Sequence, residues 1–85
     1  MGRQPGKVGP ATTYVAGELR AQKARLEWSL DTIAERSGIP RSTVDSALKG
    51  QTAIASEVLF ALCDALGLDA GVLARDALKR YREAK

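Results

Sequence analysis

The sequence predicts an all-α fold, a small bundle of five helices. Apolar residues recur three or four positions apart along much of the chain, and this spacing places side chains on one face of a helix. No run of β-branched or aromatic residues alternates with polar residues, so no segment has the pattern of a strand. A chain of 85 residues forms one domain, and its helices must pack efficiently to bury enough surface.

The N-terminal segment differs in composition from the rest of the chain. Residues 1–12 are rich in Gly and Pro, and we expect them to form a disordered arm ahead of a helical domain over residues 13–85. Arg3 and Lys7 would allow the arm to contact DNA. A plain disordered end, in part a cloning remnant, explains the same residues equally well.

The first helix is expected over residues 14–26, with Thr13 as its cap. Its apolar face comprises Val15, Leu19 and Leu26, with Gln22 as a polar interruption. Basic side chains project from the other faces and could approach a phosphate backbone or simply be solvated: Arg20, Lys23 and Arg25.

Two short helices joined by a tight turn are expected next. Ser29 is a good N-cap for the first of them, because its hydroxyl can accept a hydrogen bond from a first-turn N–H. Gly38 can adopt the left-handed conformation that often ends a helix. Pro40 fixes the chain where a helix over residues 41–49 begins, and Gly50 ends that helix.

The helix over residues 41–49 has a narrow apolar seam and a continuous polar face. Val44 and Leu48 lie four residues apart and are expected to face inward. The residues on the outer face can all hydrogen-bond: Arg41, Ser42, Thr43, Asp45, Ser46 and Lys49. Such a helix fits the DNA major groove. In the alternative interpretation, both helices belong to an ordinary bundle and the polar face contacts only water.

Two further helices complete the bundle. The fourth is expected over residues 56–66, and Asp69 is expected to cap a fifth over residues 70–82. Their inward residues are expected to be Leu59, Leu62, Leu66, Leu73 and Ala77, with Val58 and Cys63 flanking. Leu78 and Tyr81 fall on an adjacent stripe, which would serve either core packing or a dimer contact.

Composition narrows the range of functions. The formal charge is +3, and residues 1–53 carry this excess, with eight Lys/Arg against five Asp/Glu. A basic excess in the half with the two-helix motif is the direction expected of a nucleic-acid surface. Histidine is absent and Cys63 is the single cysteine, so we expect no metal site, no cofactor and no enzymatic activity. With neither a membrane-spanning run nor a signal peptide in the sequence, we expect a cytoplasmic protein.

Several short motifs together resemble a known DNA-binding family. They are Trp28-Ser29, Ile33-Ala34, Ser37-Gly38-Ile39, Arg41-Ser42-Thr43-Val44, Gly50, and Leu62 with Ala65-Leu66-Gly67. With these residues the chain resembles the lambda-repressor-like, Cro/XRE-type helix-turn-helix domains of phage and prokaryotic repressors. The resemblance spans about residues 14–81 without gaps. It implies that the second helix crosses the DNA backbone and the third reads bases.

The resemblance also implies roles for individual residues on a DNA operator. The expected base contacts are Arg41, Ser42 and Thr43, with Asp45 and Ser46 a turn further along. The expected phosphate contacts are Ser29, Leu30 and Lys49, with Lys23, Thr52 and Ser56 as further candidates. Arg41 could pair with guanine, whereas Asp45 could accept from a cytosine amine or brace Arg41. Tyr81 falls at the family's helix-five dimer contact.

Two positions depart from the family pattern. Leu30 stands where the family usually has a glutamine that touches DNA, and its side chain cannot hydrogen-bond. Ala55 stands at the cap of the fourth helix, where serine or asparagine is usual. Both departures indicate moderate rather than tight binding by a single domain.

The resemblance therefore indicates sequence-specific binding of a double-stranded DNA operator by a transcriptional regulator, most simply a phage or bacterial repressor. A homodimer would form through the fifth helix or through a C-terminal region outside this chain. The alternative is the antitoxin of a toxin–antitoxin module, which binds a protein toxin and autoregulates through the same domain.

Overall fold

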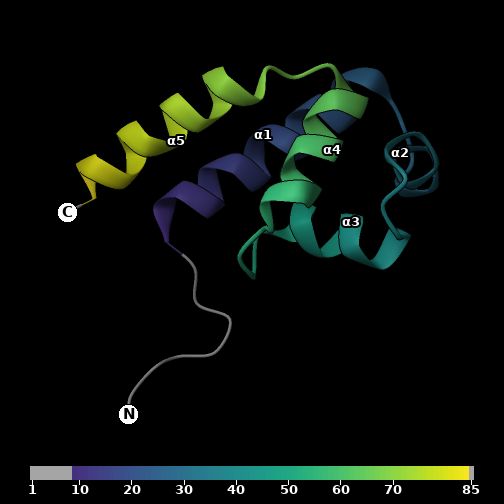
Figure 1. The fold of residues 1–85 in the computed structure, drawn as a ribbon, viewed down its shortest axis with the longest axis horizontal. Coiled ribbons are helices and arrows are strands. Elements are labelled where there is room, and N and C mark those ends of the chain that lie inside the picture. The colour runs from purple at the N-terminus through teal and green to yellow at the C-terminus, as the bar shows by residue number, and fades with distance from the viewer. Residues whose placement is uncertain (1–8, 85) are drawn as a thin grey trace, which may run out of the picture.

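The computed structural model describes residues 9–84, and these form five α-helices and no strand (Figure 1). The helices are α1 (Pro10–Leu26), α2 (Leu30–Ser37), α3 (Arg41–Lys49), α4 (Ser56–Leu66) and α5 (Ala70–Glu83). The predicted all-α class and five-helix architecture are confirmed. The proposed DNA-contacting arm residues, Arg3 and Lys7, lie outside the described residues.

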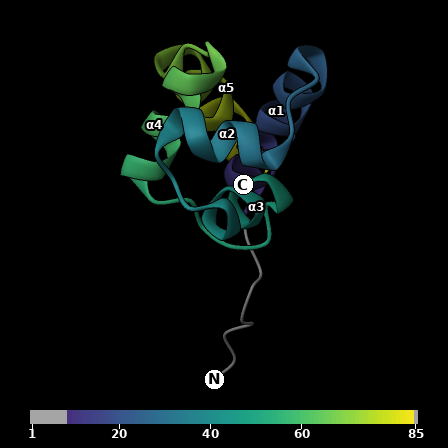
Figure 2. The same cartoon turned by 90° about the vertical axis from the view of Figure 1, so that its right-hand side faces the viewer.

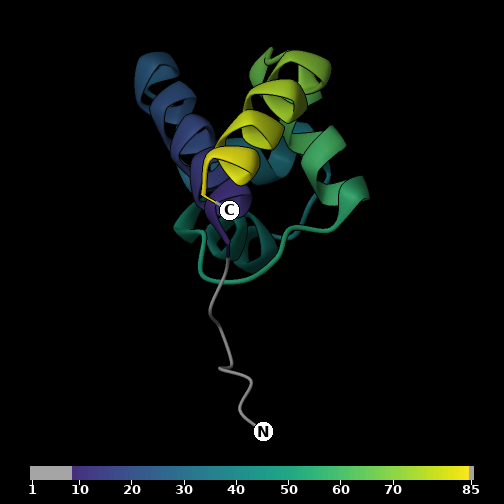
Figure 3. The same ribbon diagram turned by 90° about the vertical axis from the view of Figure 1, so that its left-hand side faces the viewer.

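The helices pack so that α3 and α5 lie on opposite sides of the bundle, with α1 and α4 between them (Figures 1 and 3). The longest helix, α1, packs against α3, α4 and α5. The second helix contacts α3 and α4, and in the view of Figure 2 it lies in front, directly above α3. Because α1 touches three of the other four helices, it is the framework on which the two-helix segment is mounted.

The start of α1 differs from its prediction. The helix begins at Pro10, not at residue 14, and Gly9 rather than Thr13 is its N-cap. Proline suits the first position of a helix, because its φ angle is already helical and no partner is needed for its missing N–H. The Thr13 hydroxyl donates to the Gly9 carbonyl oxygen at 3.2 Å, one turn back within the helix.

The core confirms most of the predicted inward positions. Its buried members are Val15, Ala16, Leu19, Ile33, Val44, Ala47, Leu48, Leu62, Cys63, Leu66, Leu73 and Ala77. Leu26, Val58 and Leu59 pack against this core while remaining partly exposed. Burial raises the pKa of the Cys63 thiol, with a smaller contribution from the Asp69 carboxylate, so the side chain stays protonated as a small apolar residue.

The cap of α2 follows the sequence prediction. Ser29 Oγ accepts a hydrogen bond from the Thr32 backbone N–H at 3.1 Å, and the two hydroxyl oxygens lie 3.0 Å apart. The cap satisfies one of the backbone donors that a helix leaves unpaired at its start.

Replacing Ser29 with alanine is expected to lower the free energy of unfolding by about 1 kcal/mol, because the Thr32 N–H loses its partner. Urea denaturation followed by circular dichroism would measure the change. Ser42→Ala is the matched control, since Ser42 is exposed on α3 and is not a capping residue. A loss no larger for Ser29→Ala than for this control would contradict the role of the cap.

Candidate nucleic-acid interface

The turn between α2 and α3 is built from local hydrogen bonds. Gly38 takes the left-handed conformation, with φ of 75°, and its N–H donates to the Ala34 carbonyl at 2.9 Å. The Ile39 N–H donates to Ser37 Oγ at 3.2 Å. Pro40 is the N-cap residue of α3, and its carbonyl accepts from the N–H groups of the first turn. The two helices therefore meet at an angle that the turn itself specifies.

The third helix is anchored through one face. Val44, Ala47 and Leu48 are buried, and the sequence predicts the first and last of these. On the outer face, four of the six predicted polar residues are exposed, namely Arg41, Ser42, Ser46 and Lys49. Thr43 and Asp45 are only partly exposed. The helix thus presents a polar surface to solvent over its whole length, with Arg41 at one end and Lys49 at the other.

The carboxyl end of α3 is held by α1. Arg20 Nη1 donates a hydrogen bond of 2.6 Å to the Leu48 carbonyl oxygen, across 28 positions of sequence. The chain then turns at Gly50, with φ of 70°, where a β-carbon would lie 2.7 Å from Ala16 Cβ. Arg20 was expected to be solvated or to approach phosphate. Its guanidinium instead satisfies a terminal carbonyl of α3, which fixes the end of the helix on the framework.

Gln22 has a corresponding role for α4. Its Nε2 donates to the Leu66 carbonyl oxygen at 2.8 Å, and its Oε1 accepts from Arg25 Nη1 at 2.8 Å. Gln22, the polar residue in the apolar face of α1, therefore caps the carboxyl end of α4. Neither this bond nor that of Arg20 has a local sequence signal, because the partners are distant in the chain.

Each cation of the third helix forms an ion pair. Arg41 Nε lies 2.8 Å from Asp31 Oδ1 in the first turn of α2. Lys49 Nζ lies 3.0 Å from Asp45 Oδ2, one turn earlier on α3. The suggestion that Asp45 braces Arg41 is therefore wrong. Asp45 is four residues from both cations, and it pairs with the one that follows it while Arg41 reaches across to α2.

A hollow of about 300 Å³ lies where α1, α2 and α3 meet. It is lined by Arg20, Lys23, Ala24, Leu30, Asp45, Leu48 and Lys49. Three residues proposed to face phosphate, Lys23, Leu30 and Lys49, are thus brought together from three helices. The adjoining start of α2 adds first-turn N–H groups, which favour anions. This hollow borders the polar face of α3 and combines positive charge with backbone donors.

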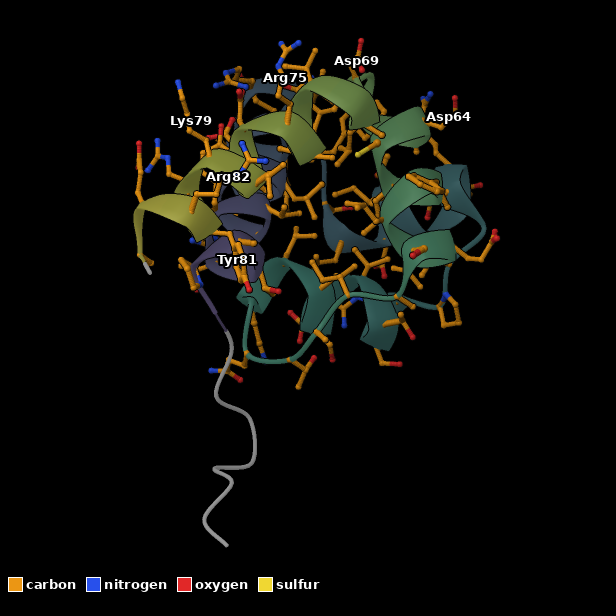
Figure 4. All side chains as sticks on the ribbon, turned by 60° about the vertical axis from the view of Figure 1, so that its left-hand side comes forward. Asp64, Asp69, Arg75, Lys79, Tyr81 and Arg82 are labelled. Atoms are coloured by element: carbon orange, nitrogen blue, oxygen red, sulfur yellow. The ribbon has the colours of Figure 1, made fainter. Side chains whose placement is uncertain are left out.

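The other candidate positions lie apart from this hollow. Thr52 is exposed in the loop after α3, and Ser56 is exposed at the start of α4. Leu78 and Tyr81 are exposed on α5, and Figure 4 shows Tyr81 near the carboxyl end of that helix. Charged side chains of the same helix, Arg75, Asp76, Lys79 and Arg82, lie around Leu78.

Within residues 9–84, no three His, Cys, Asp or Glu side chains gather as metal ligands would. In the same range, no helix has both the length and the apolar character needed to cross a membrane.

A family model described as a helix-turn-helix domain matches residues 15–78. The match includes the whole of α2, α3 and α4, together with most of α1 and α5. Searches of curated proteins and of solved structures gave no match. The predicted resemblance to helix-turn-helix domains is thereby confirmed.

Proposed function

The chain belongs to the helix-turn-helix domain family, and we propose that it binds double-stranded DNA in a sequence-specific manner as a transcriptional regulator. In this proposal α3 enters the major groove and its exposed side chains contact base edges. The observation that carries the proposal is the anchoring of α3 by buried residues on one face and by Arg20 at its end, which leaves a polar face outward. A helix held in this way can enter a groove without rearranging the core.

The proposed base contacts lie mainly in the first half of α3. Arg41 begins the helix, and its guanidinium has the planar donor geometry that pairs with guanine O6 and N7. Ser42, Thr43 and Ser46 offer hydroxyl groups that can donate or accept. Asp45 could accept from a cytosine amine. These side chains would supply sequence preference, whereas affinity would come mainly from phosphate contacts.

The proposed phosphate contacts surround the hollow beside α3. Lys23 and Lys49 supply charge, and the N–H groups at the start of α2, around Ser29 and Leu30, supply directed donors. Thr52 and Ser56 would reach the backbone beyond the end of α3. An N-terminal arm carrying Arg3 and Lys7 would add a further contact.

The biological role proposed is that of a repressor of phage or bacterial type. Such domains read two half-sites about one helical turn apart, which requires two copies. Leu78 and Tyr81 on α5 are the proposed dimer contact, and the helix that carries them lies on the other side of the bundle from α3. The same exposed α5 surface favours the alternative role of an antitoxin, in which it would hold a protein toxin.

Selection of bound duplexes from a random DNA pool, followed by affinity measurements with two variants, tests the proposal. Arg41→Ala is expected to relax the preference at one base position and to cost about 1–3 kcal/mol on the selected site. Lys49→Ala is expected to weaken binding to selected and random duplexes alike and to reduce the salt slope by about 0.9.

Thermal unfolding of both variants provides the control for loss of folded protein. Equal losses on selected and random DNA for both variants would defeat the assignment of α3 as the base-reading helix. Absence of salt-dependent DNA binding by the unaltered protein would instead favour the antitoxin role.

A further inference from the structure

The two cations at the ends of α3 are both engaged by carboxylates of the same chain. The pair Asp31–Arg41 links α2 to the start of α3, and the pair Asp45–Lys49 closes its last turn. The side chains remain accessible, with exposed fractions of 79% for Asp31, 61% for Arg41, 38% for Asp45 and 57% for Lys49. These four side chains carry two positive and two negative charges, so together they add no net charge to the proposed DNA-binding face.

This neutrality works against the approach of a phosphate. Binding to DNA of arbitrary sequence is driven almost entirely by cations that replace counterions on the backbone. Asp45 also lines the hollow that Lys23 and Lys49 share, so its carboxylate lies where a phosphate would otherwise meet two lysines. Both carboxylates therefore weaken the contacts to phosphate, which are the part of DNA binding that does not depend on base sequence.

We propose that Asp31 is a specificity-determining residue, which holds Arg41 in an ion pair and so weakens binding to DNA of arbitrary sequence, and that Asp45, paired with Lys49, weakens binding to any DNA. This inference rests on the proposed function. At an arbitrary site, a phosphate must displace a carboxylate from each cation, and one ionic contact replaces another. At the correct site, Asp31 can keep its contact with Arg41 Nε while the terminal guanidinium nitrogens pair with a guanine, and this contact is directional and bidentate.

The magnitudes allow this exchange. Opening an exposed ion pair weakens DNA binding by no more than about fivefold. A bidentate arginine–guanine contact discriminates by about fivefold to 150-fold. A phosphate that opens the Asp31–Arg41 pair therefore gains little, whereas a guanine bound with the pair intact keeps its full discrimination. A cost paid in every complex, such as opening the Asp45–Lys49 pair for a phosphate, lowers all affinities by the same factor and leaves their ratio unchanged.

The carboxylates also stabilise the helices that carry them, and the experiment must distinguish this stabilisation from an effect on DNA binding. Asp31 lies in the first turn of α2, where a negative charge stabilises the helix, and the Asp45–Lys49 pair supports α3. A structural role alone predicts that removing either carboxylate lowers the melting temperature and leaves DNA affinity per folded molecule unchanged. The proposal predicts that this affinity rises.

The experiment compares Asp31→Asn and Asp45→Asn with Asp64→Asn. Asp64 is exposed on α4, away from α3, so its substitution removes one negative charge without freeing a cation of the proposed interface (Figure 4). Dissociation constants are measured for the selected duplex and for a random duplex over a series of salt concentrations, with folded fractions checked by circular dichroism.

For Asp31→Asn and Asp45→Asn, binding to the random duplex is expected to tighten by about twofold to fivefold, and the salt slope to steepen by about 0.9 for each cation released. For Asp31→Asn, binding to the selected duplex should tighten less, so the ratio of the two affinities falls, whereas Asp45→Asn should tighten binding to both duplexes alike. Asp64→Asn should change both affinities by less than about twofold, as expected for a distant screened charge. Equal tightening on both duplexes by Asp31→Asn, or the same effects from Asp64→Asn, would overturn the proposal.

Elution from heparin provides a readout that does not depend on sequence recognition. Both α3-pair variants are expected to elute at higher salt than Asp64→Asn, because freed cations bind any polyanion more strongly. Elution of all three at the same salt would overturn the proposal. If the unaltered protein binds no DNA, the proposed function fails, whereas the heparin result still decides whether the carboxylates mask Arg41 and Lys49.

Discussion

Substitution of Gly50 by alanine is expected to lower the free energy of unfolding by about 2–4 kcal/mol. Two costs combine at this position. The backbone has φ of 70°, a left-handed conformation that side chains oppose by about 1 kcal/mol or more. The added methyl group would also lie 2.7 Å from Ala16 Cβ, so α1 or α3 would have to shift, at a further cost of about 1–3 kcal/mol.

Gly38→Ala and Gly67→Ala are matched controls for the contact term. Both glycines have φ of 75°, and a β-carbon added at either would meet nothing within 4 Å beyond its own chain neighbours. They therefore carry the conformational cost without the clash, and each should lose about 1–2 kcal/mol in urea denaturation. Equal losses at all three glycines would show that the approach of α3 to Ala16 does not constrain the fold.

Leu19→Ala is expected to have the largest effect of any single truncation, about 2–5 kcal/mol of unfolding free energy. Leu19 is fully buried on α1, the helix that packs against three others. A domain of this size is stable by only about 4–13 kcal/mol, so the variant could be largely unfolded at 37 °C. Thermal and urea unfolding, monitored by circular dichroism, would measure the loss.

Leu78→Ala makes the same chemical change at an exposed position of α5. Its cost should stay within about 0.5 kcal/mol when measured at low protein concentration, where self-association does not contribute. A loss for Leu19→Ala as small as that for Leu78→Ala would mean that the core described around α1 is not what stabilises the fold.

Local signals in the sequence are sufficient to locate most helices. Ser29 and Asp69 are side-chain caps, and each accepts a hydrogen bond from the N–H three residues later, as expected. Gly38, Gly50 and Gly67 end their helices in the left-handed conformation. These features depend on residues only a few positions apart, so composition and spacing carry enough information to predict them.

The start of α1 and the partners of several polar residues could not be predicted in this way. Composition assigns Pro10 to a disordered arm, although proline both interrupts a helix and begins one. Arg20 and Gln22 cap helices through carbonyls 28 and 44 positions away, and only the packed bundle brings these partners together. Asp45 is spaced equally from Arg41 and Lys49, so spacing alone could not identify its partner.

The sequence predicts that α3 has a polar outer face, but it does not predict how the charges on that face are paired. The outward polar face of α3 follows from helical periodicity, as do most of its anchoring residues. The pairing of Arg41 with Asp31 does not, because it joins two helices whose relative angle the turn sets. The electrostatic character of the surface therefore emerges only with the tertiary structure.

The attachment of α3 through Val44, Ala47, Leu48 and the Leu48 carbonyl has a practical consequence for engineering. None of these holding contacts involves the hydroxyl side chains at positions 42, 43 and 46. A library of helix-forming residues, without proline or glycine, at those three positions should therefore keep similar melting temperatures while its members diverge in target preference. The domain could then serve as a scaffold for variants that bind other DNA sequences.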